Sequence, residues 1–376
     1  MKKSTLALIF GLTILVLSTS TVKASDVWFW IPSTNLPQYP QVLLHPEQWN
    51  QSENLLDTYV LSMDTTSGVW QDSYLKNYVI PLQSAHHIKI AIDSGNATWL
   101  TCRKGQGTIN LQTEVDNLKH FYALGGTVDY IWMQSSLSKP VLDRLKANCP
   151  GYSIDQRLAD IITYMKAIHQ NFPAIKIGLI DNTTTHMMLH NAGTEDTYQN
   201  TYRKLMNVLK QNGQSLDFLI EDVSSEQVAG KALPGVMEYP QLLQVEQFVH
   251  NTLQIKFGLI LATYDTTASE AKEATLNIAE ARVYKARGGN PDFYVATNHY
   301  AVGAVTHLLP ENDSVNYTAT KYLLAVEKIA KNIAEKPGDL NGDGKVDILD
   351  YNTLLSGFGT KYTLLDYNTL VANFGK

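Results

Sequence analysis

The sequence predicts an α/β protein, a (β/α)8 TIM barrel followed by a small α-helical module at the C-terminus. Two observations predict the barrel: short apolar runs rich in β-branched and aromatic residues, and longer segments with helical spacing between them. A third observation, a loop dense in aspartates near the C-terminus, predicts the module. The expected divisions are residues 1–24, 25–336 and 337–376.

Strand and helix signals alternate along the large central part of the chain. The expected strands are 27–31, 59–63, 88–92, 130–133, 175–180, 218–220, 257–262 and 293–297. Helical spacing of apolar residues marks 111–124, 154–171, 197–212, 240–253 and 269–287. Eight strands fit a barrel of ordinary size. A doubly wound open sheet would need a glycine-rich phosphate turn after its first strand, and Pro32-Ser33-Thr34 follows instead.

The N-terminus has the pattern of a signal peptide. Lys2 and Lys3 precede an apolar run, 6–17, that is too short to span a bilayer. Val22 and Ala24 occupy the positions that a signal peptidase reads, so cleavage is expected after Ala24. No later apolar run is long enough for a membrane span. We therefore expect a secreted or cell-surface protein with no membrane span after signal cleavage.

Cys102 and Cys149 are the two cysteines of the chain. In an oxidising compartment an isolated pair is expected to form a disulfide. Two free buried thiols are the alternative.

Composition limits the class of partner. The 30 basic and 36 acidic residues are scattered along the chain, which argues against a nucleic-acid surface. Six Trp and 20 Tyr residues are available either to stack on sugar rings or to pack the core.

The loop from Asp339 to Asp350 carries oxygen ligands at the spacing of a calcium loop. Its expected ligands, at loop positions 1, 3, 5, 7, 9 and 12, are Asp339, Asn341, Asp343, the carbonyl of Lys345, Asp347 and Asp350. Gly344 at position 6 allows the sharp turn. Carboxylates at this density repel one another unless a cation is bound. One Ca²⁺ ion is therefore expected.

The loop departs from a standard EF-hand because position 12 is Asp and no helical stretch leads into it. Residues 345–355 recur as 361–371, and Phe358-Gly359 recurs as Phe374-Gly375. From 338 to 376 the chain resembles a type I dockerin, a duplicated calcium module. The resemblance implies a cohesin-like partner on a scaffold or cell surface. Because the second repeat lacks the first half of its loop and Thr363 replaces Asp347, we expect one ion, with Asp366 capping a helix. An intramolecular stabilising role for the module is the alternative.

Polar residues follow the expected strands where a barrel places its chemistry. The expected catalytic residues are Glu221, Asp181 and Asp93, with Glu221 as the proton donor and an aspartate as the nucleophile or base. The expected substrate-binding residues are Trp30, Trp132, Gln134, Asn298, His299 and Tyr300. Each aspartate has a second interpretation, in which its side chain only caps a turn.

This layout is similar to that of barrel-type glycoside hydrolases. The similarity implies a polysaccharide substrate and hydrolysis of an O-glycosyl bond, with the module providing calcium-dependent attachment or assembly. The chain departs from the largest such group, which has Glu after the fourth and seventh strands, because Gln134 and Thr263-Tyr264 occupy those places. A non-catalytic glycan-binding or adhesion protein is the alternative function.

Overall fold

The computed structural model describes residues 24–31, 39–63, 70–94, 111–134, 137, 153–182, 197–231, 238–263, 268–297, 307–313, 317–333, 336–340, 345–359 and 362–375. Several predicted features lie outside these ranges: residues 1–23 of the signal peptide, Cys102, Cys149, Asn298, His299, Tyr300, Asn341 and Asp343. Within the described ranges no helix is long and apolar enough to cross a membrane.

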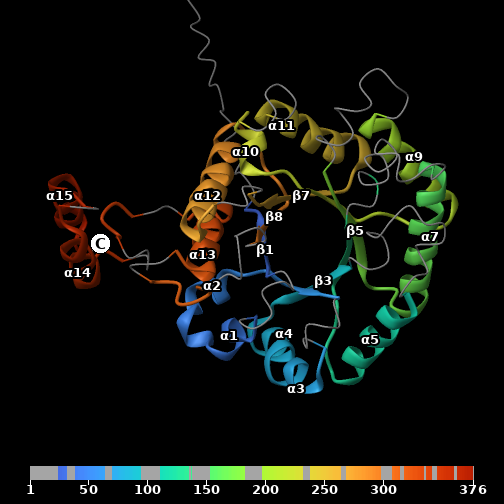
Figure 1. The fold of residues 1–376 in the computed structure, drawn as a ribbon, viewed down its shortest axis with the longest axis horizontal. Coiled ribbons are helices and arrows are strands. Elements are labelled where there is room, and N and C mark those ends of the chain that lie inside the picture. The colour runs from blue at the N-terminus through green and yellow to red at the C-terminus, as the bar shows by residue number, and fades with distance from the viewer. Residues whose placement is uncertain are drawn as a thin grey trace, which may run out of the picture.

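Eight parallel strands close into a barrel in chain order, with helices around the outside (Figure 1). The strands are β1 (Asp26–Trp30), β2 (Thr58–Ser62), β3 (Lys89–Ser94), β4 (Tyr130–Gln134), β5 (Lys176–Asp181), β6 (Phe218–Glu221), β7 (Lys256–Leu261) and β8 (Phe293–Thr297). All eight expected strands are present, and the predicted (β/α)8 barrel is confirmed.

The helical layer contains the five expected helices and several further ones. The expected set is α5 (Leu111–Ala123), α7 (Ile154–Asn171), α9 (Tyr198–Gln211), α11 (Tyr239–Phe248) with the π-helix Val249–Leu253, and α12 (Glu270–Ala286). The others are α1 (Tyr39–Leu44), the 3-10 helix Pro46–Gln48, α2 (Asn50–Leu55), α3 (Asp72–Tyr74), the π-helix Leu75–Val79, α4 (Ile80–His86), α10 (Ser225–Val228) and α13 (Ala319–Ala330). Side chains of Ser153, Thr197, Ser269 and Thr318 cap the first turns of α7, α9, α12 and α13.

Side chains fill the barrel lumen. Alternate residues of each strand point inward, and the inner cluster comprises Trp28, Trp30, Val60, Ala91, Tyr130, Trp132, Ile180, Phe218, Ile220, Ile260, Ala262, Phe293 and Val295. The Trp28 ring stacks on Phe293 at 4.1 Å between centroids. Gly178 and Gly258 leave space for the rings of Phe218 and Phe293. A Cβ atom at these glycines would lie 2.2 Å from Phe218 and 2.3 Å from Phe293. These rings fill the N-terminal part of the lumen, so a ligand would enter the lumen from the C-terminal ends of the strands.

Four aspartates tie the strands together at the opposite, N-terminal end. Each one directly precedes an even-numbered strand, and its carboxylate accepts the backbone N–H of a residue in the preceding odd-numbered strand. The pairs are Val27 with Asp57, Ile90 with Asp129, Ile177 with Asp217 and Phe257 with Asp292, at 2.8 to 3.1 Å. The same aspartate-to-backbone hydrogen bond thus recurs every two strands and stabilises the N-terminal end of the barrel.

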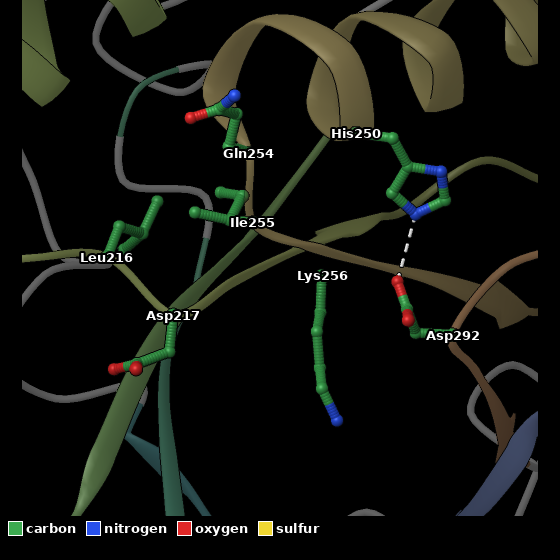
Figure 2. A pocket seen from close by; sticks show the side chains of 7 residues that line it. All are labelled: Leu216, Asp217, His250, Gln254, Ile255, Lys256 and Asp292. Carbon is green, nitrogen blue, oxygen red and sulfur yellow. Dashed lines mark hydrogen bonds and ion pairs between the residues drawn. The ribbon is translucent and has the colours of Figure 1, made fainter.

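A shallow pocket lies at this N-terminal end, lined by Leu216, Asp217, His250, Gln254, Ile255, Lys256 and Asp292 (Figure 2). Within it, His250 Nε2 and Asp292 Oδ2 form an ion pair at 2.9 Å. The hydrogen bond to Asp292 raises the pKa of His250 and outweighs burial. Burial alone would raise the pKa of Asp292, but His250 and the Phe257 N–H together lower it. Because catalysis in barrels occurs at the other end, we assign this pocket to stability.

The His250–Asp292 pair is expected to make stability depend on pH. Its contribution, about 1 kcal/mol for a partly exposed pair, is fully present between the unfolded pKa values of Asp and His, about 4 and 6.5. It is lost as pH rises through the raised pKa of His250 or falls through the lowered pKa of Asp292. The urea concentration at the unfolding midpoint should differ between pH 6 and pH 9 in the wild type, and His250→Gln should reduce that difference. His45→Gln, which alters an exposed pair, should leave it unchanged, and equal effects of both variants would contradict the assignment.

Two helices, α14 (Ile348–Gly357) and α15 (Leu364–Asn373), form a separate pair, drawn apart from the barrel at the left of Figure 1. Their small core consists of Val346, Leu354 and Leu370, and the last two are equivalent positions of the sequence repeat. Gly338 has φ +96, and a Cβ there would lie 2.7 Å from the Leu370 Cα, so glycine is required where the chain enters this unit.

Candidate active site

The C-terminal ends of the strands bring a set of polar side chains to the upper end of the lumen. Strand alternation places the following residues on the inner face: Ser62, Asp93, Gln134, Asn182, Asp222 and Thr297. Beneath them lie Trp30, Trp132, Ile180 and Ile260. The site therefore has an apolar floor and a polar wall, the arrangement expected for a ligand pocket.

Asp93 is the most sharply defined group of this site. It is paired in register with Trp132 and is 5% exposed. Its Oδ1 accepts hydrogen bonds from Trp132 Nε1 at 2.6 Å and from Gln134 Nε2 at 2.7 Å. Burial raises the pKa of Asp93 to about 7, although both hydrogen bonds act to lower it. A carboxyl group with this pKa exchanges a proton at neutral pH.

Asp181 lies on the other face of its strand, toward the helices. Its Oδ2 accepts the Tyr202 hydroxyl at 2.9 Å and the Leu137 N–H at 3.0 Å, and the residue is fully buried. Tyr202 belongs to the cluster between sheet and helices. Asp181 therefore holds α9 and the segment after β4 in place, and this position does not support its expected role as a nucleophile.

Glu221 also faces the helices. It pairs with Asp181 and with Leu259, a residue of the outer cluster, and it is fully buried. The pKa of Tyr198, on α9, is raised to about 12 by the burial of Tyr198 itself and by the charge of Glu221. The expected role of Glu221 as proton donor would require its carboxyl group to reach the lumen, and strand alternation turns it away.

Strand alternation, extended one residue past the end of β6, places Asp222 on the lumen side as a second carboxyl group. Burial, the charge of Glu226 and the charge of Asp222 raise the pKa of Glu280 on α12. The Asp222 N–H donates to the Asp181 carbonyl at 2.9 Å, so the ladder between β5 and β6 continues through Asp222. Ile220 lies in the inner cluster, whereas Val223 lies in the outer one. The same alternation that removes Glu221 from the lumen brings Asp222 into it.

Trp30 and Trp132 are buried at the floor of the site rather than presented on its wall. Their rings meet edge to face at 5.6 Å between centroids, and Trp132 stacks on Trp28 at 5.9 Å. Their exposures are 3% and 0%. Trp132 donates a hydrogen bond to Asp93. Gln134, which was expected to bind substrate, donates a second hydrogen bond to the same carboxylate.

The calcium loop is described in part. Asp350 is fully buried, and its carboxylate oxygens accept the N–H groups of Leu340 at 2.6 Å and Asp347 at 2.8 Å. In the second repeat, Asp366 accepts the N–H and hydroxyl of Thr363, so the expected helix-capping role of Asp366 is confirmed. Among the described residues alone, which exclude Asn341 and Asp343, no three acidic, His or Cys side chains are grouped to hold a metal ion.

The comparisons with known proteins concern the barrel. No family model and no curated protein matches the chain. Similar solved structures include a glucosidase from Croceicoccus marinus at 12% identity and TM-score 0.45, which aligns over 75% of this chain and 62% of that one. A β-glycosidase aligns at 12% identity and TM-score 0.48 over 80% and 88%. An endo-β-N-acetylglucosaminidase from Cordyceps militaris aligns at 12% and 0.42 over 82% and 91%.

The likeness is one of fold. The chain spans less than two thirds of the glucosidase, and every one of these TM-scores is below 0.5. A shared barrel does not specify a shared reaction.

Proposed function

We propose that the barrel is a glycoside hydrolase that acts on a polysaccharide. The observation that carries this proposal is Asp93, a buried carboxyl group with a pKa of about 7 at the C-terminal end of β3. Asp222 supplies a second carboxyl group on the lumen side of β6. Glycoside hydrolysis requires a pair of this kind, one group to protonate the leaving oxygen and one to act as nucleophile or base.

In this mechanism Asp93 is the proton donor. Because its Oδ1 accepts from Trp132 and Gln134, Oδ2 carries the proton of the acid form. The two donors restrain the carboxyl group and leave Oδ2 as the oxygen that gives its proton to the substrate. Asp222 is the nucleophile or base. Asp181 and Glu221, which face the helices, support the strands that carry Asn182 and Asp222.

Incubation of the mature chain with a panel of polysaccharides tests the activity, with release of reducing ends as the readout. We expect release from at least one glycan by the wild type. Binding to a glycan with no release would instead assign the chain to the non-catalytic glycan-binding or adhesion class.

We further propose that the chain is exported through the signal peptide 1–24 and that its C-terminal module binds one Ca²⁺ ion. The available donors are carboxylate, amide and carbonyl oxygens, which are the ligands that a hard cation prefers. Buried Asp350 already connects both ends of the loop by accepting from Leu340 and Asp347. When bound, the ion would neutralise the clustered carboxylates and order the loop.

The module is proposed to attach the enzyme to a protein partner of the cohesin class. The apolar side chains exposed on it are Ile348, Leu349, Leu355, Phe358, Leu364, Leu365, Tyr367, Val371 and Phe374. Leu364 and Leu365 are 64% and 74% exposed with the barrel present. The barrel therefore leaves this apolar surface uncovered, which favours an external partner over an intramolecular role.

A further inference from the structure

A second buried carboxyl group lies behind Asp93, on the helix side of β3. Glu114 of α5 is 1% exposed. Ser94 Oγ donates to its carboxylate, at 2.9 Å from Oε2 and 3.1 Å from Oε1. The Tyr164 hydroxyl of α7 lies 2.8 Å from Glu114 Oε2 and 3.0 Å from Ser94 Oγ. These three groups join one strand and two helices through a closed set of hydrogen bonds.

The position of this triad relates it to the active site. Ser94 is the last residue of β3, and its side chain points to the helices, whereas Asp93 points into the lumen. The Asp93 carbonyl accepts the Met63 N–H at 3.0 Å, so β2 holds the peptide from one side. Glu114 and Tyr164 hold the side chain of Ser94, the residue after Asp93, from the helix side of the strand. The backbone that carries the Asp93 carboxyl group is thereby fixed at both ends.

We propose that Glu114 is a positioning residue for Asp93, acting through Ser94 and Tyr164 to hold the end of β3 against α5 and α7. The proposal rests on the proposed function in so far as Asp93 is the proton donor. Burying a carboxylate costs free energy that its hydrogen bonds must offset, and Ser94 and Tyr164 supply these bonds from the strand and helix that Glu114 joins. The two carboxyl groups are also coupled, because the charge of Asp93 contributes to the raised pKa of Glu114.

That coupling has a definite sign. Burial raises the pKa of Glu114 to about 7, the hydroxyls of Tyr164 and Ser94 lower it, and the charge of Asp93 raises it. The ionisable groups that face Glu114 are Tyr164 from α7 and Asp93 from β3. Coupling between two titrating groups is reciprocal. Burial and the hydrogen bonds from Trp132 and Gln134 are the main causes that set the pKa of Asp93. Removing the charge of Glu114 should add a smaller effect, which eases the ionisation of Asp93 and lowers its pKa.

The test uses tryptophan fluorescence, because Trp132 donates its indole N–H to Asp93. Wild-type protein should show a fluorescence transition near pH 7, and Asp93→Asn should abolish it, which identifies the signal. In Glu114→Gln the midpoint should fall below that of the wild type. Asp116→Asn, a change at an exposed site on the same helix, should leave the midpoint in place. An unchanged midpoint in folded Glu114→Gln protein would overturn the proposal.

Tyr164→Phe supplies a second variant that keeps the carboxyl group. It removes one donor to Glu114, so Glu114 should stay neutral to higher pH and the Asp93 midpoint should again fall. A midpoint that stays at the wild-type value in Tyr164→Phe, as in Glu114→Gln, counts against the coupling. The titration needs no glycan. If no polysaccharide is cleaved, the proposed function fails while the shift in midpoint still decides the role of Glu114.

Discussion

Asp93→Asn is expected to lower the turnover number for glycan hydrolysis by about 10² to 10⁴-fold, the range for loss of a general acid. The amide oxygen of Asn can still accept from Trp132 and Gln134, so the site should keep its shape. The wild-type rate should fall as pH rises through about 7, because the acid form of Asp93 is lost. The residual rate of Asp93→Asn should lack that transition.

Asp222→Asn should also reduce turnover strongly, but its residual rate should keep the fall near pH 7. That difference separates the two roles, since the variant retains the Asp93 proton donor. Substrate affinity should change little in either variant. A pH profile of Asp93→Asn that matches the wild type would remove Asp93 from the mechanism.

Asp350→Ala is expected to abolish calcium binding by the C-terminal module and to unfold it. The substitution removes a proposed ligand and both hydrogen bonds that close the loop, to Leu340 and Asp347. With a core of three buried apolar residues, the module has little else to stabilise it. Calorimetry on the mature chain should show one Ca²⁺ per wild-type molecule and none for Asp350→Ala. Limited proteolysis should then release residues after about 336 from this variant.

Asp366→Ala is the matched control, because the sequence repeat relates Asp366 to Asp350. Asp366 forms the same capping box with Thr363 that Asp350 forms with Asp347. Its loss should weaken only the capping box at the start of α15 and leave the calcium stoichiometry at one. A stoichiometry of two in the wild type, or loss of binding in Asp366→Ala, would show that the second repeat also binds metal.

The barrel could be predicted from the sequence because its strands and long helices have strong and regular apolar patterns. The short helices between β1 and β3 were not predicted. Segments such as Ile80–His86 are too brief for helical spacing to stand out, and they depend on packing against the sheet. The four aspartates at the N-terminal end were also missed, since each hydrogen bond joins residues 30 to 40 positions apart.

Asp93, Asp181 and Glu221 lie at the C-terminal ends of strands, as expected, but the inner and outer faces of those ends were not distinguished. Asp181-Asn182 and Glu221-Asp222 each place one polar side chain inward and one outward. Gly178 and Ile180 lie two positions apart on the inner face of β5, and extending that alternation by two residues reaches Asn182. This two-residue alternation could have been read from the sequence, and it would have placed Asn182 and not Asp181 on the inner face. The partners of Asp93 could not have been read from the sequence, because Trp132 and Gln134 meet it only through the register of β3 with β4.

Turnover by Glu221→Gln tests most directly whether the lumen-facing carboxyl groups perform the chemistry. The variant should be shown to be folded, then assayed beside Asp93→Asn on the same glycan at the same pH. We predict turnover within about threefold of wild type for Glu221→Gln, because its side chain faces the helices and a substitution there acts only through packing. A loss in Glu221→Gln as large as that in Asp93→Asn would contradict this assignment.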